Sequence, residues 1–387
     1  MEIGSIYEIN PQGIPHKEEG DSWGFALGGT EKYGKKNVVF TMSGRAAIAL
    51  ALRSIAKNRP EIEKKCLLPA YMCDTVFFPF EQEGWRIYFY HVNKKLEADE
   101  EELSRLMERI RPGLLFIHAY YGVDTWKPMR SLFQRWKAQG VCIMEDVTQS
   151  YYLEGIGKEA DYVVGSLRKW YPVPDGGFAA SGEPLIRVGI HPEEEFTEKR
   201  MELLTEKWEY LYGAGKPEEK KEMKRDFLKK NREMEEWLDR YKGIGGISGL
   251  SAGMLSKVNE EECRNKRKEN YRYLYGRLRG KRQLWPILSD DEDRGTAPLY
   301  LAVYAKDREE LQSFLIKHDI YAPVLWPVGR ENRDCLTEDE KYIYRHMLAL
   351  PIDQRYGRQE MERIEGVLDE YELLTNRTRN SKLLKEI

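Results

Sequence analysis

Short apolar runs alternate with stretches of helical periodicity through the first two-fifths of this 387-residue chain. The runs NVVFTM (37–42), LLFIHAYYG (114–122), VCIMED (141–146) and DYVVGSL (161–167) have the length and composition of buried strands. Strands that alternate with helices are joined by right-handed crossovers and build a mostly parallel sheet. The sequence therefore predicts an α/β fold in which helices flank a mostly parallel central sheet.

The chain changes character near residue 191. Long, highly charged stretches of helical period fill residues 191–242, and their apolar positions are too irregular for coiled-coil heptads. We expect these helices to cover the sheet or to pack in a dimer contact. Further on, APLYLAVYA (297–305) and IYAPVLWPV (320–328) are typical of strands, with a helical stretch between them. We therefore expect a large domain over 1–250 and a smaller C-terminal α/β domain over 251–387.

Charge and composition exclude several classes of protein. The net charge of −3, from 62 basic and 65 acidic side chains, argues against a dedicated nucleic-acid-binding protein. The basic stretch 261–282 contains tyrosines, but these fall with Leu274 and Leu278 on one helical face, which favours a packed helix. No apolar run could cross a bilayer, and residues 1–23 do not look like a signal peptide. Scattered cysteines and histidines predict a reduced, cytoplasmic protein without a metal site.

Asp146 stands at the end of the apolar run VCIMED. Ligands of open α/β sheets gather at the carboxyl ends of the strands, so this carboxylate is a candidate site residue. An aspartate in this position is equally typical of a helix cap or a strand-end turn, and on this residue alone both interpretations stay open.

Lys169 follows the next strand and lies within GSLRKWYPVPDGG (165–177). A lysine at the mouth of an α/β sheet is either a surface residue or an amine used for Schiff-base chemistry. The two prolines and the paired glycines after it predict a fixed, close-packed turn. A merely solvated lysine does not require such a turn, so the sequence favours the second interpretation.

A third feature, SGRAAI (43–48), opens a helix directly after a strand. The free backbone N–H groups and the dipole of such a helix start can hold a phosphate, although serine N-caps are common. An amine, a carboxylate and a phosphate cradle are the three anchors that pyridoxal phosphate requires. The order and spacing of Lys169, Asp146 and this turn therefore predict a pyridoxal-phosphate enzyme.

The same motifs resemble those of the DegT/DnrJ/StrS aminotransferases, a branch of the fold-type-I pyridoxal-phosphate enzymes that mostly act on nucleotide-linked keto-sugars. The segments that carry the resemblance are EDVTQS (145–150), GSLRKWYPVPDGG (165–177), SGRAAI (43–48), IHAYYG (117–122), LPAYMCDT (68–75) and LALPIDQRYGRQEMERI (348–364). The likeness covers most of the chain and is strongest from 37 to 180.

The resemblance implies a role for each matching residue. Asp146 would pair with the pyridinium nitrogen, Gln149 would contact the ring hydroxyl, and Lys169 would form the Schiff base. Ser166 and the backbone amides near Gly44 and Arg45 would hold the phosphate. This set comprises the predicted catalytic residues, Lys169 and Asp146, and most of the predicted cofactor-binding residues.

Three departures from the family pattern bear on the site. Cys73 is a predicted cofactor-binding residue at the position where the family carries a ring-stacking aromatic, so Tyr71, Tyr120 or Tyr121 could supply the ring instead. Ser166 lies three residues before the lysine, where five are usual. Trp326 stands near the place of a family histidine.

The resemblance implies a ping-pong aminotransferase that moves an amino group from a donor such as glutamate to a ketone, most readily on a nucleotide-linked keto-sugar. It also implies a homodimer, in which Asn231 or residues 245–253 could reach the partner's phosphate site. Two alternatives stay open: a transaminase of a non-sugar substrate, and a non-catalytic regulator of the same fold. A lysine rather than a histidine at 169 favours amino transfer over dehydration.

Overall fold

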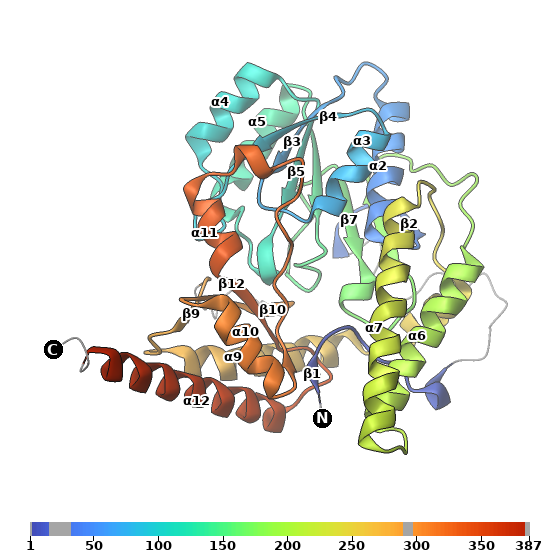
Figure 1. Cartoon of the computed structure of the whole chain (residues 1–387). Coiled ribbons are helices and arrows are strands. Elements are labelled where there is room, and N and C mark those ends of the chain that lie inside the picture. The colour runs from blue at the N-terminus through green and yellow to red at the C-terminus, as the bar shows by residue number, and fades with distance from the viewer. Residues whose placement is uncertain (1, 15–31, 289–296, 384–387) are drawn as a thin grey trace.

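A computed structural model describes residues 2–14, 32–288 and 297–383 of the chain. Figure 1 shows a large sheet with helices around it, a smaller sheet with its own helices beneath, and a pair of long helices, α6 and α7, beside the large sheet. Residues 15–23, part of the stretch on which the signal-peptide argument rests, lie outside the described residues.

The large sheet has seven strands in the order β2-β8-β7-β6-β5-β3-β4. They are β2 (Asn37–Thr41), β3 (Lys65–Pro69), β4 (Arg86–Tyr90), β5 (Leu114–His118), β6 (Cys142–Asp146), β7 (Tyr162–Ser166) and β8 (Gly177–Ser181). β4, β3, β5, β6 and β7 pair in parallel, whereas β8 runs antiparallel to both β7 and β2. The predicted mostly parallel sheet is confirmed.

Both faces of the large sheet are buried, as the unbroken apolar runs require. In β5, Leu115 and Ile117 pack on one face with helices α4 (Glu100–Ile110) and α5 (Phe133–Ala138). Leu114 and Phe116 point to the other face, which α2 (Gly44–Asn58) and α3 (Phe77–Gln82) cover. The carboxyl ends of the strands are thus held by a core on each side.

The smaller part contains a three-stranded antiparallel sheet and a two-stranded parallel one. Its strands are β9 (Leu284–Pro286), β10 (Tyr300–Ala305), β12 (Met347–Pro351), β1 (Ile3–Gly4) and β11 (Ile320–Tyr321). Its helices are α9 (Glu260–Leu278), α10 (Arg308–Lys317), α11 (Glu338–His346) and α12 (Arg358–Leu383). Because β1 pairs with β11, the start of the chain lies beside the C-terminal part. The predicted division near residue 250 remains a prediction.

Two predicted elements differ in the structure. The strand expected over 320–328 ends at Tyr321, because Pro323 and Pro327 have no N–H to contribute to a strand ladder. The segment PMRSLFQRWKAQG (128–140), whose proline start and glycine end predict one helix, begins as a 3-10 helix over Lys127–Leu132 and becomes the α-helix α5 only at Phe133. Neither difference alters the order of elements.

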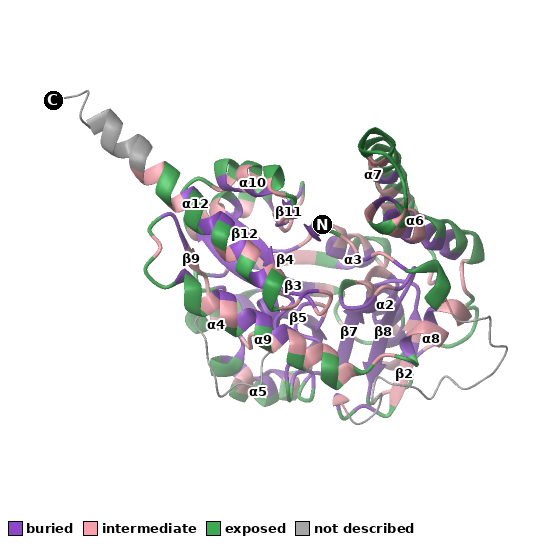
Figure 2. Ribbon diagram, turned by 90° about the horizontal axis from the view of Figure 1, so that it is seen from below, coloured by how far each residue is buried: buried purple, intermediate pink, exposed green. Residues whose placement is uncertain are grey.

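The charged stretch 191–242 forms a helical hairpin of α6 (Glu194–Tyr212) and α7 (Pro217–Arg240). Figure 2 shows much of α7 exposed as it projects from the body of the molecule. At its base, Phe196 of α6 and Leu238 of α7 pack against Met42 and Ala46, where α2 begins. The hairpin therefore stands directly over the start of α2.

The structure also bears on the predictions for the basic stretch, the cysteines and membrane spans. Helix α9 buries Leu274 and Leu278, which confirms that this basic stretch is a packed helix. All five cysteines are free. Within the described ranges, no helix combines the length and apolarity needed to cross a membrane.

Candidate active site

The predicted site residues meet at the carboxyl ends of the central strands. His118, Asp146 and Ser166 are the last residues of β5, β6 and β7, which are neighbours in the sheet. They border a cavity of about 340 Å³, called here the strand-end cavity. All of the predicted residues line this cavity: Gly44, Arg45, Cys73, Asp146, Gln149, Ser166 and Lys169. The roles that the sequence assigned to them remain predictions.

The turn before α2 is a cradle of backbone groups. Ser43 caps the helix, and its Oγ accepts a hydrogen bond from Ala46 N at 3.2 Å. Gly177 makes this turn possible, since a Cβ there would lie 2.4 Å from the carbonyl carbon and oxygen of Ser43. The second glycine of the PDGG motif therefore brings the helix start down onto the sheet, where its free N–H groups can hold an anion.

Asp146 is buried and only partly committed to protein partners. Its Oδ1 accepts a hydrogen bond from Thr148 N at 2.8 Å, and its Oδ2 lies 3.5 Å from Nδ1 of His118. The His118 ring is almost completely buried, yet neither ring nitrogen has a hydrogen-bond partner among the described residues. Buried polar atoms are rarely left unpaired, so this corner of the cavity is built to contact a polar group.

Lys169 projects into the cavity from the 3-10 turn that follows β7. Its side chain is accessible from the cavity and has no hydrogen-bond partner among the described residues. Protein nevertheless surrounds the ammonium, and this desolvation lowers its pKa; Glu235 opposes the shift and Arg168 adds to it. A lysine in such surroundings loses its proton more readily than one in water.

The turn after Lys169 is fixed by several bonds, as its prolines and glycines predict. Trp170 donates from Nε1 to the Thr148 carbonyl oxygen at 2.8 Å. Asp175 is buried and accepts from Thr197 Oγ1 at 2.6 Å and from Ser248 N at 3.1 Å. Burial raises the pKa of the Asp175 carboxyl group, and these hydrogen bonds oppose that shift. The lysine thus stands on a segment tied to β6, α6 and α8 (Gly249–Leu255).

The other predicted residues occupy distinct places in the cavity wall. Ser166 lies against Gly44: a Cβ added at Gly44 would come within 3.3 Å of the Cβ of Ser166. Gln149 accepts from Tyr121 N at 3.0 Å through Oε1. Cys73 Sγ is 3.1 Å from Thr75 Oγ1, and burial raises the pKa of its thiol.

Two aromatic residues that line the cavity, Tyr300 and Trp326, come from the C-terminal part of the chain. Tyr71, Tyr120 and Tyr121 are fully buried and do not border the cavity, and which aromatic residue would stack on the cofactor remains a prediction. Trp326 lines the cavity instead, and its ring centroid is 5.1 Å from that of Tyr71. Trp326 has a φ of 65°, an uncommon conformation for a bulky residue.

A second cavity, of about 440 Å³, lies on the other side of Lys169. Residues 4–7 of the N-terminal segment form part of its wall, and it is called here the N-terminal cavity. Lys169, Arg168 and Glu235 line both cavities. The lysine therefore stands where the two spaces meet.

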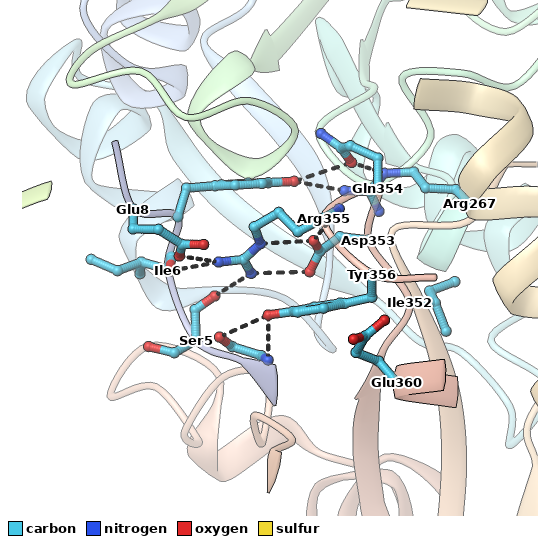
Figure 3. Close-up of polar contacts among 12 residues, drawn as sticks. Ser5, Ile6, Glu8, Arg267, Ile352, Asp353, Gln354, Arg355, Tyr356 and Glu360 are labelled. Carbon is cyan, nitrogen blue, oxygen red and sulfur yellow. Dashed lines mark hydrogen bonds and ion pairs between the residues drawn. The ribbon is translucent and has the colours of Figure 1, made fainter. Parts of the chain in front are cut away.

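Ionic and polar contacts hold the wall of the N-terminal cavity (Figure 3). Arg355 contacts Asp353 through two hydrogen bonds of 2.8 and 3.0 Å, and Glu8 at 2.7 Å. Arg267 is completely buried and donates to Gln354 Oε1 at 2.7 Å and to Tyr7 Oη at 2.8 Å. The N-terminal segment is thus tied to the residues that follow β12.

The helical hairpin supplies charged groups that the sequence did not reveal. Glu235 of α7 has Oε1 at 3.2 Å from Nη2 of Arg200 on α6 and at 3.5 Å from Nη1 of Arg168. Arg45 reaches the same helix, with Nη2 at 3.8 Å from Glu235 Oε2 and a second ion pair to Asp239. Burial opposes the ionisation of Glu235, but the positive charges of Arg168 and Arg200 outweigh it and lower its pKa to about 2. No local motif distinguishes these residues from the many charged neighbours on the same helices.

Asn231, which was expected near a partner's phosphate site, accepts from Arg200 Nη1 at 2.9 Å within the same chain. No cluster of histidine, cysteine and acidic side chains suited to a metal ion occurs in the described part of the chain. The polar groups of the site are thus the Lys169 amine, the carboxylates, the arginines and the N–H groups at the start of α2.

No protein-family model matches this chain, and no curated protein matches it. Solved structures do match. A DegT DnrJ EryC1 StrS aminotransferase from Brucella abortus is 14% identical, with 89% of this chain and 88% of that chain covered and a TM-score of 0.61. Helicobacter pylori PseC, an aminotransferase involved in the biosynthesis of pseudoaminic acid, is 13% identical, with 96% and 99% covered and a TM-score of 0.67.

NtdA from Bacillus subtilis, solved with bound cofactor PMP, is 14% identical, with 89% of this chain and 75% of that chain covered and a TM-score of 0.62. At such identities the likeness establishes the fold. This chain has the fold of these aminotransferase structures, as the resemblance in its motifs implied.

Proposed function

We propose that this chain is a pyridoxal-phosphate-dependent aminotransferase that moves an amino group from a donor such as glutamate to a ketone on a nucleotide-linked keto-sugar. The observation that carries the proposal is the meeting of Lys169, Asp146 and the start of α2 around the strand-end cavity. The aminotransferases that share the fold support the reaction class, and PMP bound to NtdA supports the cofactor.

The residues of the strand-end cavity fit pyridoxal phosphate. The N–H groups at the start of α2, together with Ser166, would hold the phosphate, and Gly177 leaves room for the turn that presents them. Asp146 would bind the protonated ring nitrogen, and His118 lies beside it, with Nδ1 at 3.5 Å from Asp146 Oδ2. Lys169 Nζ would bind the aldehyde carbon.

Bound pyridoxal phosphate would supply a ring that withdraws electrons from the carbon carrying the amino group. The protein must then move a proton at that carbon, and Lys169 Nζ is the group in place to do so. Burial lowers the pKa of Lys169, so its amine is neutral in a larger fraction of molecules and can accept the proton. The fixed turn from Trp170 to Asp175 keeps Nζ directed into the cavity.

The visible absorption spectrum of the purified protein tests this proposal. Protein supplied with pyridoxal phosphate should show a visible band that bleaches on addition of glutamate. Lys169→Ala should lose the band, because the amine that binds the aldehyde is gone. Lys158→Ala, which changes an exposed lysine, is the matched control and should keep it. A protein that gains no band, or that keeps the band in Lys169→Ala, would overturn the proposed function.

The acceptor is tested separately, because the bulky side chain of Trp326 in the cavity wall limits the space for a keto-sugar. Nucleotide-linked keto-sugars and simple keto acids should be compared as acceptors after the donor reaction. Transfer to the keto-sugars alone would support the proposed substrate. Transfer to keto acids alone would favour the non-sugar transaminase, and the amino-transfer reaction itself would stand.

We propose a homodimer on the resemblance alone, and measurement of the molecular mass in solution tests it. A monomeric mass at all protein concentrations would remove this part of the proposal.

A further inference from the structure

Positive charge exceeds negative charge in the wall of the N-terminal cavity. Its lining includes five basic side chains and two carboxylates. The basic residues are Arg168, Lys169, Arg200, Arg267 and Arg355, and the carboxylates are Glu235 and Asp353. Such an imbalance in a partly enclosed space favours the binding of an anion.

Two of the five basic groups are already satisfied. Arg355 is neutralised by Asp353 and Glu8. Arg267 donates all of its described hydrogen bonds to uncharged oxygen atoms, among them the carbonyl oxygens of Pro298 and Leu299. In the described part of the chain, the guanidinium groups in this wall that keep unsatisfied donors are therefore those of Arg168 and Arg200, next to Lys169.

Arg168 and Arg200 share one carboxylate and are incompletely paired. Both keep a buried Nε atom without a hydrogen-bond partner among the described residues, and Arg200 is only 5% exposed. Strong guanidinium–carboxylate bonds are about 2.7–2.9 Å long. Glu235 lies farther away, at 3.2 Å from Arg200 and 3.5 Å from Arg168. Glu235 thus pairs loosely with both arginines, and another oxyanion in its place could form shorter hydrogen bonds to them.

Glu235 is also well placed to leave. It enters from α7, which projects from the body of the molecule (Figure 2), and its side chain is 42% exposed and lines both cavities. Of the two cavities, Arg200 lines the N-terminal one and Arg45 the strand-end one, whereas Arg168 lines both, so the Arg168–Arg200 pair is reached from the N-terminal cavity beside the lysine. The phosphate cradle at α2 belongs to the other cavity.

We propose that Arg168 and Arg200 form a subsite for an oxyanion of the substrate, and that Glu235 is an internal counter-ion which this oxyanion displaces. That the oxyanion belongs to a substrate rests on the proposed function. Two substrate groups share this chemistry: the carboxylate of an amino donor or oxo acid, and the diphosphate of a nucleotide-linked sugar. An internal competitor lowers the affinity for either group in proportion to the fraction of molecules in which the subsite is left free.

Calorimetric binding of 2-oxoglutarate and of uridine diphosphate to the purified full-length protein tests the proposal. Glu235→Gln keeps the size of the side chain and removes its charge, so the anion that uses the subsite should bind about tenfold more tightly. Glu236→Gln removes a charge from the exposed neighbour on the same helix and should change the affinity less than about twofold. Unchanged or weaker binding of both anions to Glu235→Gln would overturn the proposal.

A substitution of Arg200 tests the other half of the proposal, because loss of its positive charge should weaken anion binding. Arg200→Gln should weaken the same anion at least about tenfold, whereas Lys199→Gln, which removes an exposed positive charge from α6, should not. An equal effect of the two substitutions would mean that only the general charge of the helix matters, and the subsite would be rejected. If Glu235→Gln does not fold, Glu235→Asp retracts the carboxylate from both arginines and should tighten binding in the same direction by a smaller factor.

The two ligands separate the two sources of the oxyanion. A response confined to 2-oxoglutarate assigns the subsite to the carboxylate, and a response confined to uridine diphosphate assigns it to the diphosphate. The visible absorption spectrum reports on the proposed function independently. Protein that gains the band but binds both anions as tightly in Glu235→Gln as in the wild type would refute the subsite alone. Protein without the band that shows the expected binding changes would refute the proposed function alone.

Discussion

The two cavities that meet at Lys169 are built in different ways. Backbone elements form the strand-end cavity: the ends of β5, β6 and β7, and the start of α2. Long side chains form much of the N-terminal cavity, with arginines from the segment after β7, from α6, from α9 and from the segment after β12. The first cavity has its shape from hydrogen-bonded strands, and the second has its shape from charged and polar side-chain contacts.

Because of this difference, we expect the two cavities to tolerate different kinds of substitution. A strand end cannot move without breaking the sheet, so the strand-end cavity should respond mainly to changes of backbone or of volume. The wall of the N-terminal cavity should respond to the removal of a single charged group, since each buried partner would be left unpaired. Two substitutions test this contrast, and a third tests a contact between the two parts of the chain.

Arg267→Met should have the largest effect. The substitution keeps an apolar stem but removes the donor to Tyr7 Oη and to two carbonyl oxygens, and it leaves Gln354 Oε1 only the 3.3 Å bond from Tyr7 Oη. It also removes a guanidinium whose carbon lies 4.6 Å from the Trp170 ring centroid. We expect a loss of about 3–5 kcal/mol in the free energy of unfolding, measured by denaturant titration. Arg272→Met, on an exposed position of α9, should lose less than about 0.5 kcal/mol. Similar losses of unfolding free energy in Arg267→Met and Arg272→Met would contradict the expectation that the wall of the N-terminal cavity depends on single charged groups.

Gly177→Ala tests the strand-end cavity through its backbone. The added Cβ would lie 2.4 Å from backbone atoms of Ser43, so the turn before α2 must shift. We expect a loss of about 1–3 kcal/mol in stability and weaker binding of pyridoxal phosphate, followed by absorbance titration. Gly182→Ala, beyond the end of β8, has nothing within 4 Å of the new Cβ and serves as the control. Unimpaired cofactor binding in Gly177→Ala would show that the cradle does not depend on this close approach.

His91→Gln should have the smallest effect, at a contact between the two parts of the chain. His91 Nδ1 lies 2.9 Å from Oε2 of the buried Glu340 in α11, and this hydrogen bond raises the pKa of His91. The folded protein therefore binds the proton more tightly than the unfolded chain does. The resulting stability, about 1 kcal/mol, is fully present below the unfolded pKa near 6.5 and is lost as the pH rises through the folded pKa.

Thermal unfolding measured from pH 5.5 to 8.5 checks this expectation. The wild type should lose the contribution of His91 across the upper part of the range, and His91→Gln should lack that part of the pH dependence. The exposed His191→Gln should follow the wild type. Parallel curves for the wild type and His91→Gln would show that the contact contributes no pH dependence.

Much of the strand-end cavity could be predicted from the sequence because its parts are local. Asp146 ends an apolar run, Lys169 precedes a turn of prolines and glycines, and Ser43 caps a helix after a strand. Each of these places follows from a few neighbouring residues and from the rule that ligands gather at the carboxyl ends of strands.

The N-terminal cavity could not be predicted in the same way. Arg200 and Glu235 are two charged residues among many on α6 and α7, and only the packing of the hairpin over α2 brings them to Lys169. Trp326 was noticed as a departure from a family pattern, but its place in the cavity wall depends on how the C-terminal part meets the large sheet. Contacts of this kind join residues far apart in the chain and leave no local pattern.

The pairing of β1 with β11 also bears on the order of events during synthesis. The backbone N–H of Gly4 donates to Tyr356 Oη, a partner 352 positions further along the chain. The segment around Gly4 is therefore synthesised long before the partner that fixes its position. Contacts of such long range form slowly because a large loop must close first. Closure of the N-terminal segment should accordingly be a late step of folding, reached after the seven-stranded sheet has formed.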